Sequence, residues 1–180
     1  DVVAIGNAIV DIIGRCDDAY LAKHNCPKGS MSLVDNEKIT ALYAGMGPGI
    51  EISGGSAANT AVGVASFGGK AAFLGKIADD DFGRIFAHDI KSSGVTFNAT
   101  PHKNGAPTSR SLILVTPDGE RTMNTLLGIS TELGEAELDP ATIAGLVAAS
   151  QDAAQAAPEA RDSAPALAGQ EVSDDWEAPS

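Results

Sequence analysis

Apolar residues follow two different spacings along the first 150 positions of the chain. Short continuous apolar runs between turn residues are typical of buried strands, whereas apolar positions three or four apart are typical of helices that cover a sheet. The runs predict strands at 2–5, 9–15, 31–34, 71–77, 111–115 and 121–127. The helical spacing predicts helices at 18–24, 35–44, 57–67, from 80 or 81 to 93, and at 139–148.

The order of these elements predicts the class of fold. Strands and helices alternate over most of the stretch, which favours a mostly parallel sheet with helices on both faces. Two parts break the alternation, namely the segment 9–34 and the hairpin around the turn Thr116-Pro117-Asp118-Gly119-Glu120. We expect these parts, at about 9–34 and 108–127, to form a small β layer over one edge of an α/β sheet.

The pattern changes near Gln151. Residues 151–180 contain nine Ala, three Pro and seven acids, with Leu167, Val172 and Trp176 as their large apolar residues. A segment that cannot bury an apolar face is expected to be disordered or weakly helical. We therefore predict a folded part at 1–150 and an acidic tail at 151–180. Two origins of the tail stay open, a native acidic extension or a frameshifted or truncated gene model.

Charge and cysteine content narrow the classes of partner. The net charge is −12, and half of it lies in the tail, so we expect neither nucleic acid nor an anionic membrane as a partner. No apolar run reaches 18 residues, so no transmembrane helix is expected. Cys16 and Cys26 lack metal-ligand spacing and are expected to be free thiols in a cytoplasmic protein. The three histidines, His24, His88 and His102, stand among polar neighbours and are expected at the surface.

The first candidate for chemistry is the run Gly6-Asn7-Ala8-Ile9-Val10-Asp11-Ile12. Its acid, Asp11, comes soon after the first strand, and ligands of open α/β sheets bind beyond the carboxyl ends of strands. A carboxylate there can accept hydrogen bonds from two adjacent hydroxyl groups. The alternative is a turn in which Asp11 bonds to its own backbone. Spacing alone favours the turn, and it is the Gly-Gly run further along the chain that favours ligand binding by Asp11.

The second candidate is the run Gly54-Gly55-Ser56-Ala57-Ala58-Asn59. Two glycines allow the backbone to approach a ligand closely, and the Asn59 amide can both donate to and accept from a hydroxyl group. The alternative interpretation is a tight strand-to-helix turn with Asn59 in the first turn of the helix.

These runs together resemble one family. The Gly-Gly run, followed by Gly75 and by Asp79-Asp80-Asp81-Phe82-Gly83, resembles the first signature of the PfkB carbohydrate kinases, which are ribokinase-like. Within this family, the runs at 6–12 and 115–124 resemble the adenosine kinase pattern more closely than the ribokinase pattern. The second signature of the family, Asp-Thr-x-Gly-Ala-Gly-Asp, is not found in these 180 residues. The resemblance extends from residue 1 to about 150 and implies the N-terminal half of a three-layer α/β/α sheet with a β lid over the sugar site.

The resemblance also implies which residues bind substrate. It assigns Asn7, Asp11, Gly54, Gly55 and Asn59 to the sugar. In adenosine kinase-like members, the residues that match Met123 and Thr125 line the base pocket, and Met31 could close it from another strand. Ordinary packing of the lid is the alternative for each Met.

The implied activity is transfer of the γ-phosphate of ATP, with Mg²⁺, to a ribosyl or other sugar hydroxyl. The substrate would be a small sugar or nucleoside. The catalytic Asp of the family belongs to the signature that is not found, so we assign no catalytic residue and no metal ligand, and we expect this chain alone to be inactive. Two alternatives stay open, a non-catalytic sugar-binding or nucleoside-binding module and a defective fragment without a stable fold.

Overall fold

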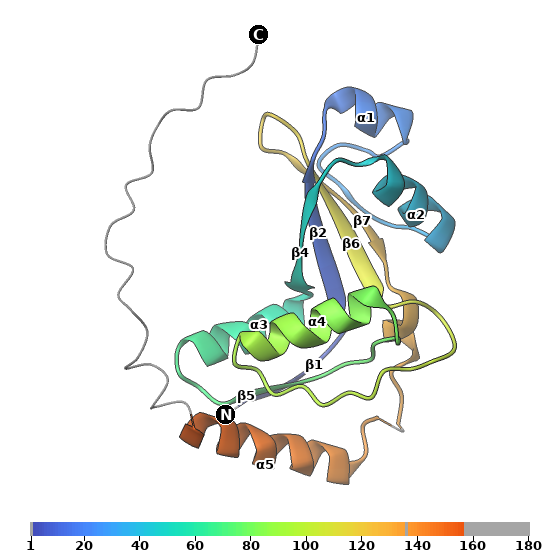
Figure 1. The fold of residues 1–180 in the computed structure, drawn as a ribbon. Helices are drawn as coiled ribbons and strands as arrows, with labels where there is room; N and C mark the ends of the chain where they lie inside the picture. Colours follow the sequence, from blue (N-terminus) through green and yellow to red (C-terminus); the bar gives the residue numbers. More distant parts are fainter. Residues whose placement is uncertain (1, 136, 157–180) are drawn as a thin grey trace, which may run out of the picture.

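The computed structural model describes residues 2–135 and 137–156, with side chains to residue 150. Its lower part has three layers (Figure 1). Strand β1 (Val2–Ile5) pairs in parallel with β5 (Ala71–Leu74). Helices α3 (Ser56–Ser66) and α4 (Asp81–Ser92) cover one face of this pair, and α5 (Pro140–Ala156) covers the other.

The alternation of side chains along β5 explains the layers. Ala71 and Phe73 point to the core shared with α3 and α4, and Ala72 and Leu74 point to Leu146 of α5. The rings of Phe73, Phe86 and Phe97 form the centre of the larger core, with centroids 5.4–5.9 Å apart. Because strand side chains alternate between faces, one short apolar strand can bury residues against helices on both sides.

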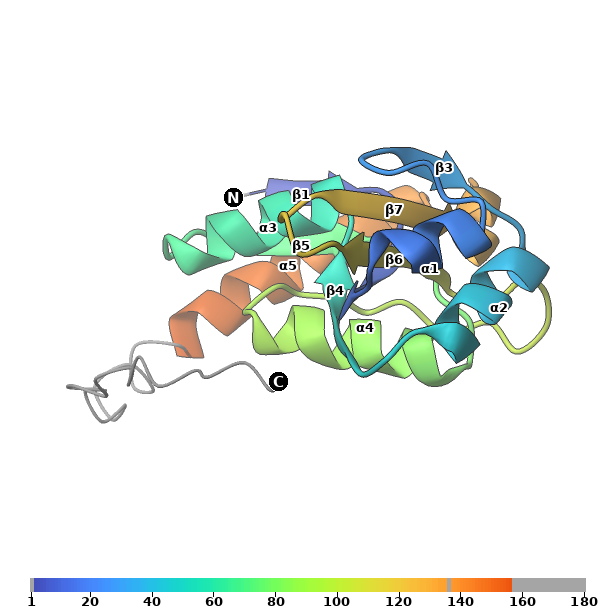
Figure 2. The same cartoon turned by 90° about the horizontal axis from the view of Figure 1, so that it is seen from above.

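A second sheet stands on these layers as a lid. It contains β2 (Ile9–Arg15), β3 (Met31–Leu33), β4 (Gly49–Gly54), β6 (Ser109–Val115) and β7 (Arg121–Leu126). The strand order is β3-β7-β6-β2-β4. Helices α1 (Asp18–Lys23) and α2 (Asn36–Gly45) lie on one side of this sheet, and α4 runs alongside β4 (Figure 2). The predicted small β layer is therefore confirmed.

Local sequence signals explain where the helices begin. The carboxylates of Asp17, Asp35 and Asp80 each accept a hydrogen bond from a backbone N–H three residues further on, at Tyr20, Lys38 and Gly83. Such caps satisfy donors that the first turn of a helix leaves unpaired. Each of these helices begins where the sequence predicted it.

Other features differ from the predictions. Strand β4 was not predicted, β5 ends at Leu74 rather than near Ile77, and a 3₁₀-helix occupies Gly128–Glu132. Strand β1 is parallel as expected, but Ile5 is 49 % exposed, because β5 is its one strand neighbour among the described residues.

At the other end of the folded part, α5 continues past its predicted end near Ala148 to Ala156. The expectations for residues 157–180 lie outside the described residues. Cys16 and Cys26 are both free, as predicted. Across the described part of the chain, no helix combines the length and the apolarity that crossing a membrane requires.

Candidate substrate site

A row of polar side chains crosses the lid at Asp11. Asp11 lies inside β2, where it pairs with Ser111 of the parallel strand β6, and Ser111 pairs with Thr125 of β7. Directly paired residues project from the same face of a sheet, so all three share one face. The Ser111 and Thr125 hydroxyl oxygens are 2.8 Å apart and hydrogen-bonded. Ser111 was not among the predicted site residues, although a serine heading the apolar run Ser-Leu-Ile-Leu-Val was a signal for it.

The two predicted methionines belong to the next row on the same face. Met123 of β7 pairs with Ile113 of β6 on one side and with Met31 of β3 on the other. Met123 is half-buried, whereas Met31 is 58 % exposed. The structure therefore brings Asp11, Met31, Met123 and Thr125 onto one face of the lid.

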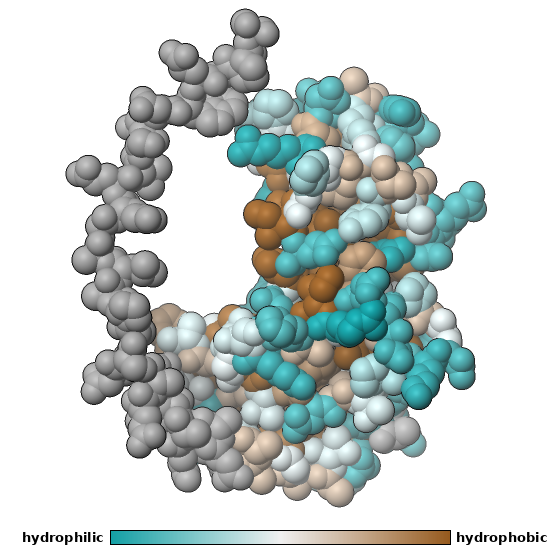
Figure 3. All heavy atoms as spheres, in the orientation of Figure 1, coloured by the Kyte–Doolittle hydropathy of each residue, from teal (hydrophilic) through white to brown (hydrophobic). Residues whose placement is uncertain are grey.

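This face is the open one. The opposite face carries fully buried apolar residues that pack against α1 and α2; they are Val10, Ile12, Leu112 and Leu114. On the open face, Leu33, Ile50 and Ile52 are exposed in addition to Met31. Figure 3 shows hydrophobic residues gathered on the lid above its junction with the layers below. An apolar surface with an acid set into it can contact both the rings and the hydroxyl groups of a ligand.

The absence of a side chain at Gly54 leaves room for the Asp11 carboxylate. It is buried at the end of β4, opposite Ile9, and a Cβ atom on it would lie 2.2 Å from Oδ2 of Asp11. The carboxylate therefore rests against bare backbone, and a larger residue at position 54 would displace it.

Gly55 joins the lid to the layers below. It has φ 92°, a conformation that favours glycine, and a Cβ atom on it would lie 2.7 Å from the carbonyl oxygen of Asn7. Gly55 is also the residue before α3, and its carbonyl accepts from the backbone N–H of Asn59 at 2.9 Å. Asn7 and Asn59 are both exposed. Asn7, Gly55 and the first turn of α3 thus meet beyond the carboxyl end of β1.

The Asp11 carboxylate has no protein partner within the part of the chain that the structure describes. Its side chain takes part in no hydrogen bond or ion pair there, and burial raises its pKa above the usual value of 3.8. Carboxylates that are half-buried without a partner are costly to keep charged, which is typical of groups that bind or react.

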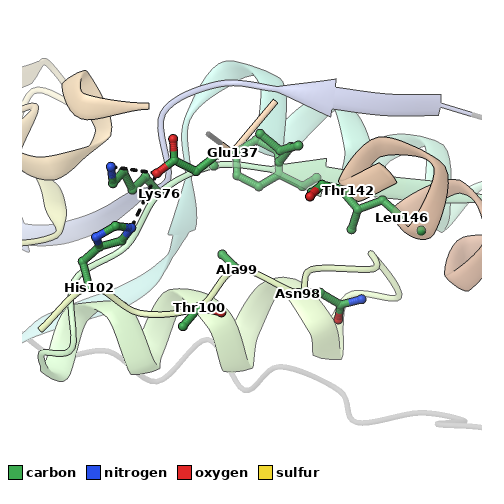
Figure 4. A pocket seen from close by; sticks show the side chains of 12 residues that line it. Lys76, Asn98, Ala99, Thr100, His102, Glu137, Thr142 and Leu146 are labelled. Atoms are coloured by element: carbon green, nitrogen blue, oxygen red, sulfur yellow. Dashed lines mark ion pairs between the residues drawn. The ribbon is translucent and has the colours of Figure 1, made fainter. Parts of the chain in front are cut away.

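A separate pocket of about 430 Å³ lies between β5 and α5 (Figure 4). At one end, Nζ of Lys76 is 2.8 Å from Oε1 of Glu137 and donates to the carbonyl of Glu132 at 2.9 Å. Nε2 of His102 is 3.6 Å from the same Glu137 oxygen. The Lys76 ammonium and the Glu137 carboxylate neutralise each other, and this pair ties the connection between β7 and α5 to the segment that follows β5. None of the predicted site residues lines this pocket.

Solved structures of other proteins share this arrangement. The structure of adenosine kinase from Sinorhizobium meliloti has a TM-score of 0.71 and 55% sequence identity, covering 77% of this chain and 42% of that one. The probable sugar kinase from Rhizobium etli CFN 42 has a TM-score of 0.68 and 53% identity, covering 76% of this chain and 43% of its own. The fold is the ribokinase-like sheet with a lid that the sequence predicted.

Comparison with curated proteins gives the same family. Probable fructokinase-4 of Arabidopsis thaliana and the fructokinase of Solanum tuberosum are each 40% identical over 72 residues, or 40% of this chain. The chain spans 22% and 23% of these relatives and less than half of the two solved structures. The pattern described as pfkB family carbohydrate kinase matches residues 51–162, more than half of the sequence. The chain therefore belongs to the pfkB family of carbohydrate kinases.

Proposed function

We propose that the open face of the lid and the start of α3 hold the sugar of an ATP-dependent carbohydrate or nucleoside kinase. The observation that carries this proposal is the half-buried Asp11 carboxylate, which rests against Gly54 without a protein partner in the described part of the chain. Its two oxygens can accept from two adjacent hydroxyl groups of a sugar.

The neighbouring residues then have distinct roles. Gly54 and Gly55 let the sugar ring lie against backbone, and the exposed amides of Asn7 and Asn59 can donate to its remaining oxygens. Holding the acceptor hydroxyl in one orientation is a large part of catalysis in phosphoryl transfer.

A nucleoside is the substrate that we favour. Met31, Met123 and Thr125 lie on the same face as Asp11, and the flexible thioether side chain of Met adapts well to a flat base. The adenosine kinase at 55% identity supports this choice. The fructokinases at 40% identity over a shorter stretch support a hexose as the alternative.

ATP would supply the phosphoryl group, and Mg²⁺ would neutralise the charge that develops on it. Among residues 2–135 and 137–156, no three His, Cys, Asp or Glu side chains gather as a metal site. None of these residues is therefore assigned to Mg²⁺. We propose that the catalytic Asp and its glycine-rich anion site belong to a segment outside this sequence.

Calorimetry would test the binding role. Adenosine, ribose and fructose would be titrated into the chain, into Asp11→Asn, and into Asp18→Asn, which removes an exposed acid on the lid as a matched control. We expect at least one of the three ligands to bind. Its affinity should be the same for the starting chain and for Asp18→Asn, and lower for Asp11→Asn. Equal affinity for Asp11→Asn and the starting chain would remove Asp11 from the site.

A further inference from the structure

The back of the lid meets the start of α4 at an aromatic contact. Phe82, the second residue of α4, lies under the guanidinium group of Arg110, whose Cζ is 4.9 Å from the ring centroid. The Tyr43 ring of α2 meets Phe82 edge-on, at 5.9 Å between centroids and an angle of 83°. Arg110 and Tyr43 belong to the lid, whereas Phe82 belongs to the layers below.

Arg110 is held tightly on its lid side. Its Nη2 donates to Oδ1 of Asn36 at 3.1 Å and to Oγ1 of Thr40 at 3.2 Å, both in the N-terminal half of α2. Its Nε is buried without a hydrogen-bond partner among the described residues, and burial lowers the pKa of the Arg110 guanidinium group. The face of Phe82 therefore supplies attraction to a cation that has lost much of its water.

Two further bonds join α4 to the lid. The Asp89 carboxylate accepts from the backbone N–H of Ser53 at 2.6 Å, and Ser53 directly precedes Gly54. The Asp80 carboxylate accepts from the backbone N–H of Thr108 at 2.9 Å, just before β6. Helix α4 thus contacts the lid near β4, near the start of β6 and, through Phe82, at Arg110.

We propose that Phe82 and Arg110 are positioning residues that set the angle between the lid and the layers below. Arg110 directly precedes Ser111, so the two project from opposite faces of β6. Ser111 pairs with Asp11, and a shift of Arg110 against Phe82 therefore moves Asp11 relative to Gly55 and Asn59. The consequence for ligand binding rests on the proposed function, whereas the lid angle itself does not.

Three residues of the run Asp80-Asp81-Phe82-Gly83 thereby have a physical role, namely Asp80, Phe82 and Gly83. Asp80 caps α4 and holds Thr108. A Cβ atom on Gly83 would lie 2.1 Å from the carbonyl oxygen of Ala78, so the absence of a side chain lets the first turn of α4 lie close to the loop that follows β5. That close approach presents the Phe82 ring to the lid.

Residual dipolar couplings of backbone amides would test the lid angle directly. They would be measured on the 180-residue chain, on Phe82→Leu, and on Phe82→Trp, which keeps an aromatic face. Phe67→Leu is the matched control, because Phe67 is 94 % exposed after α3. We expect one common alignment for lid and layers in the starting chain, Phe82→Trp and Phe67→Leu. In Phe82→Leu, the couplings of the lid should no longer fit the alignment tensor of the layers below. They should need a separate tensor of smaller magnitude, because the lid then moves relative to those layers.

Couplings within each part should still fit its own structure in Phe82→Leu, which shows that both parts remain folded. Arg110→Lys, which keeps the charge and loses the planar group, provides a second variant with the same expected loss of common alignment. A lid that keeps its orientation and order in both Phe82→Leu and Arg110→Lys would overturn the proposal.

Ligand affinity provides an independent second measurement. Where the starting chain binds adenosine, we expect binding about twofold to fivefold weaker in Phe82→Leu, with recovery in Phe82→Trp. Unchanged affinity in Phe82→Leu would overturn the link between lid angle and site. Failure of the starting chain to bind adenosine, ribose or fructose would count against the proposed function, and the couplings would still decide the lid angle.

Discussion

At the scale of single residues, Asp11 combines a cost in stability with the role in binding that we propose for it. Burial raises its pKa in the folded chain, so the folded chain holds a proton there more readily than the unfolded chain does. The stabilising effect of this proton is complete below the unfolded pKa and disappears as the pH rises through the folded pKa. At neutral pH the charged side chain therefore opposes folding, which is typical of residues kept for function.

Replacing Asp11 with Asn should move stability and affinity in opposite directions. We expect a higher melting temperature at pH 7, with the difference from the starting chain vanishing near pH 4 and below. Affinity for the sugar or nucleoside should fall about tenfold to a hundredfold, because bonds to a charged acceptor contribute roughly 1.5–3 kcal/mol. Thermal melts at several pH values and calorimetry measure the two effects. A lower melting temperature at pH 7 would contradict the assigned cost.

Affinity of the starting chain should also depend on pH. The ionised carboxylate accepts from two hydroxyl groups, whereas the protonated form keeps less accepting capacity. Because the pKa is raised, we expect affinity to decline on acidification at a higher pH than for an ordinary Asp, that is, above 3.8. Titrations between pH 4 and pH 8 would show this, and a flat profile in Asp11→Asn is the control.

A pair of glycine substitutions tests the close approach at Gly54. In Gly54→Ala, the new Cβ would lie 2.2 Å from the Asp11 carboxylate, which must move, so we expect an affinity loss of about tenfold or more. Gly63→Ala, within α3, meets no atom within 4 Å and should raise stability by about 0.5–1 kcal/mol without changing affinity. Equal affinity in the two variants would contradict the role of Gly54.

At the scale of elements, the ion pair of Lys76 and Glu137 ties the connection after β7 to β5. Lys76 is 9% exposed, and its ammonium lowers the pKa of Glu137. In Glu137→Gln, the buried ammonium keeps the carbonyl of Glu132 but faces a neutral amide oxygen instead of a carboxylate, and we expect a loss of about 1–3 kcal/mol in the free energy of unfolding. Denaturant unfolding measures it, with the exposed Glu135→Gln as control.

The pH dependence of this loss has a definite sign. A lowered folded pKa means that the Glu137 carboxylate stabilises the fold above the unfolded pKa and loses that effect as the pH falls through the folded value. The difference between the starting chain and Glu137→Gln should therefore shrink at pH values below about 4.5. A constant difference down to pH 3 would indicate that packing, rather than charge, carries the effect.

Elements set by neighbouring residues were predictable, and pairings between distant segments were not. The caps at Asp35 and Asp80 and the turn at 116–120 follow from a few adjacent side chains. Strand β4 was missed because Ile50 and Ile52 are exposed and lie between glycines, so the segment carries little apolar signal. The pairing of Ser111 with Thr125 follows from the predicted hairpin, whereas the pairing of Asp11 with Ser111 joins strands about 100 residues apart along the chain, a register that no local pattern specifies.

At the scale of the whole molecule, the residues of the proposed site come from two bodies. Asp11 and Met123 belong to the lid, whereas Asn59 belongs to α3 in the layers below. The resemblance to a family named these residues together, whereas periodicity alone could not bring residues of the lid and of α3 into one group. Residue types suggested the chemistry that we propose, and the assembly of the lid on α3 and α4 decides whether the groups can act together.

We expect the 180-residue chain to bind its ligand without phosphorylating it. The sequence contains no Asp-Thr-x-Gly-Ala-Gly-Asp run, and a general base together with oxyanion donors supplies several orders of magnitude in rate. Incubation with ATP, Mg²⁺ and adenosine, ribose or fructose, followed by product chromatography, measures turnover. Product above a no-protein control that disappears in Asp11→Ala would contradict the expectation.

The glycines at the two ends of β4 restrict how this protein can change its length. Gly54 lies against the Asp11 carboxylate, and a Cβ on Gly49 would approach the carbonyl oxygen of Ile13 to 3.1 Å. A one-residue insertion within β4 would bring a side chain to one of these crowded positions and reverse the faces of Ile50 and Ile52. Insertions should instead be tolerated at exposed tips such as 103–105, so length variation among descendants of this sequence should collect there rather than beside the acid.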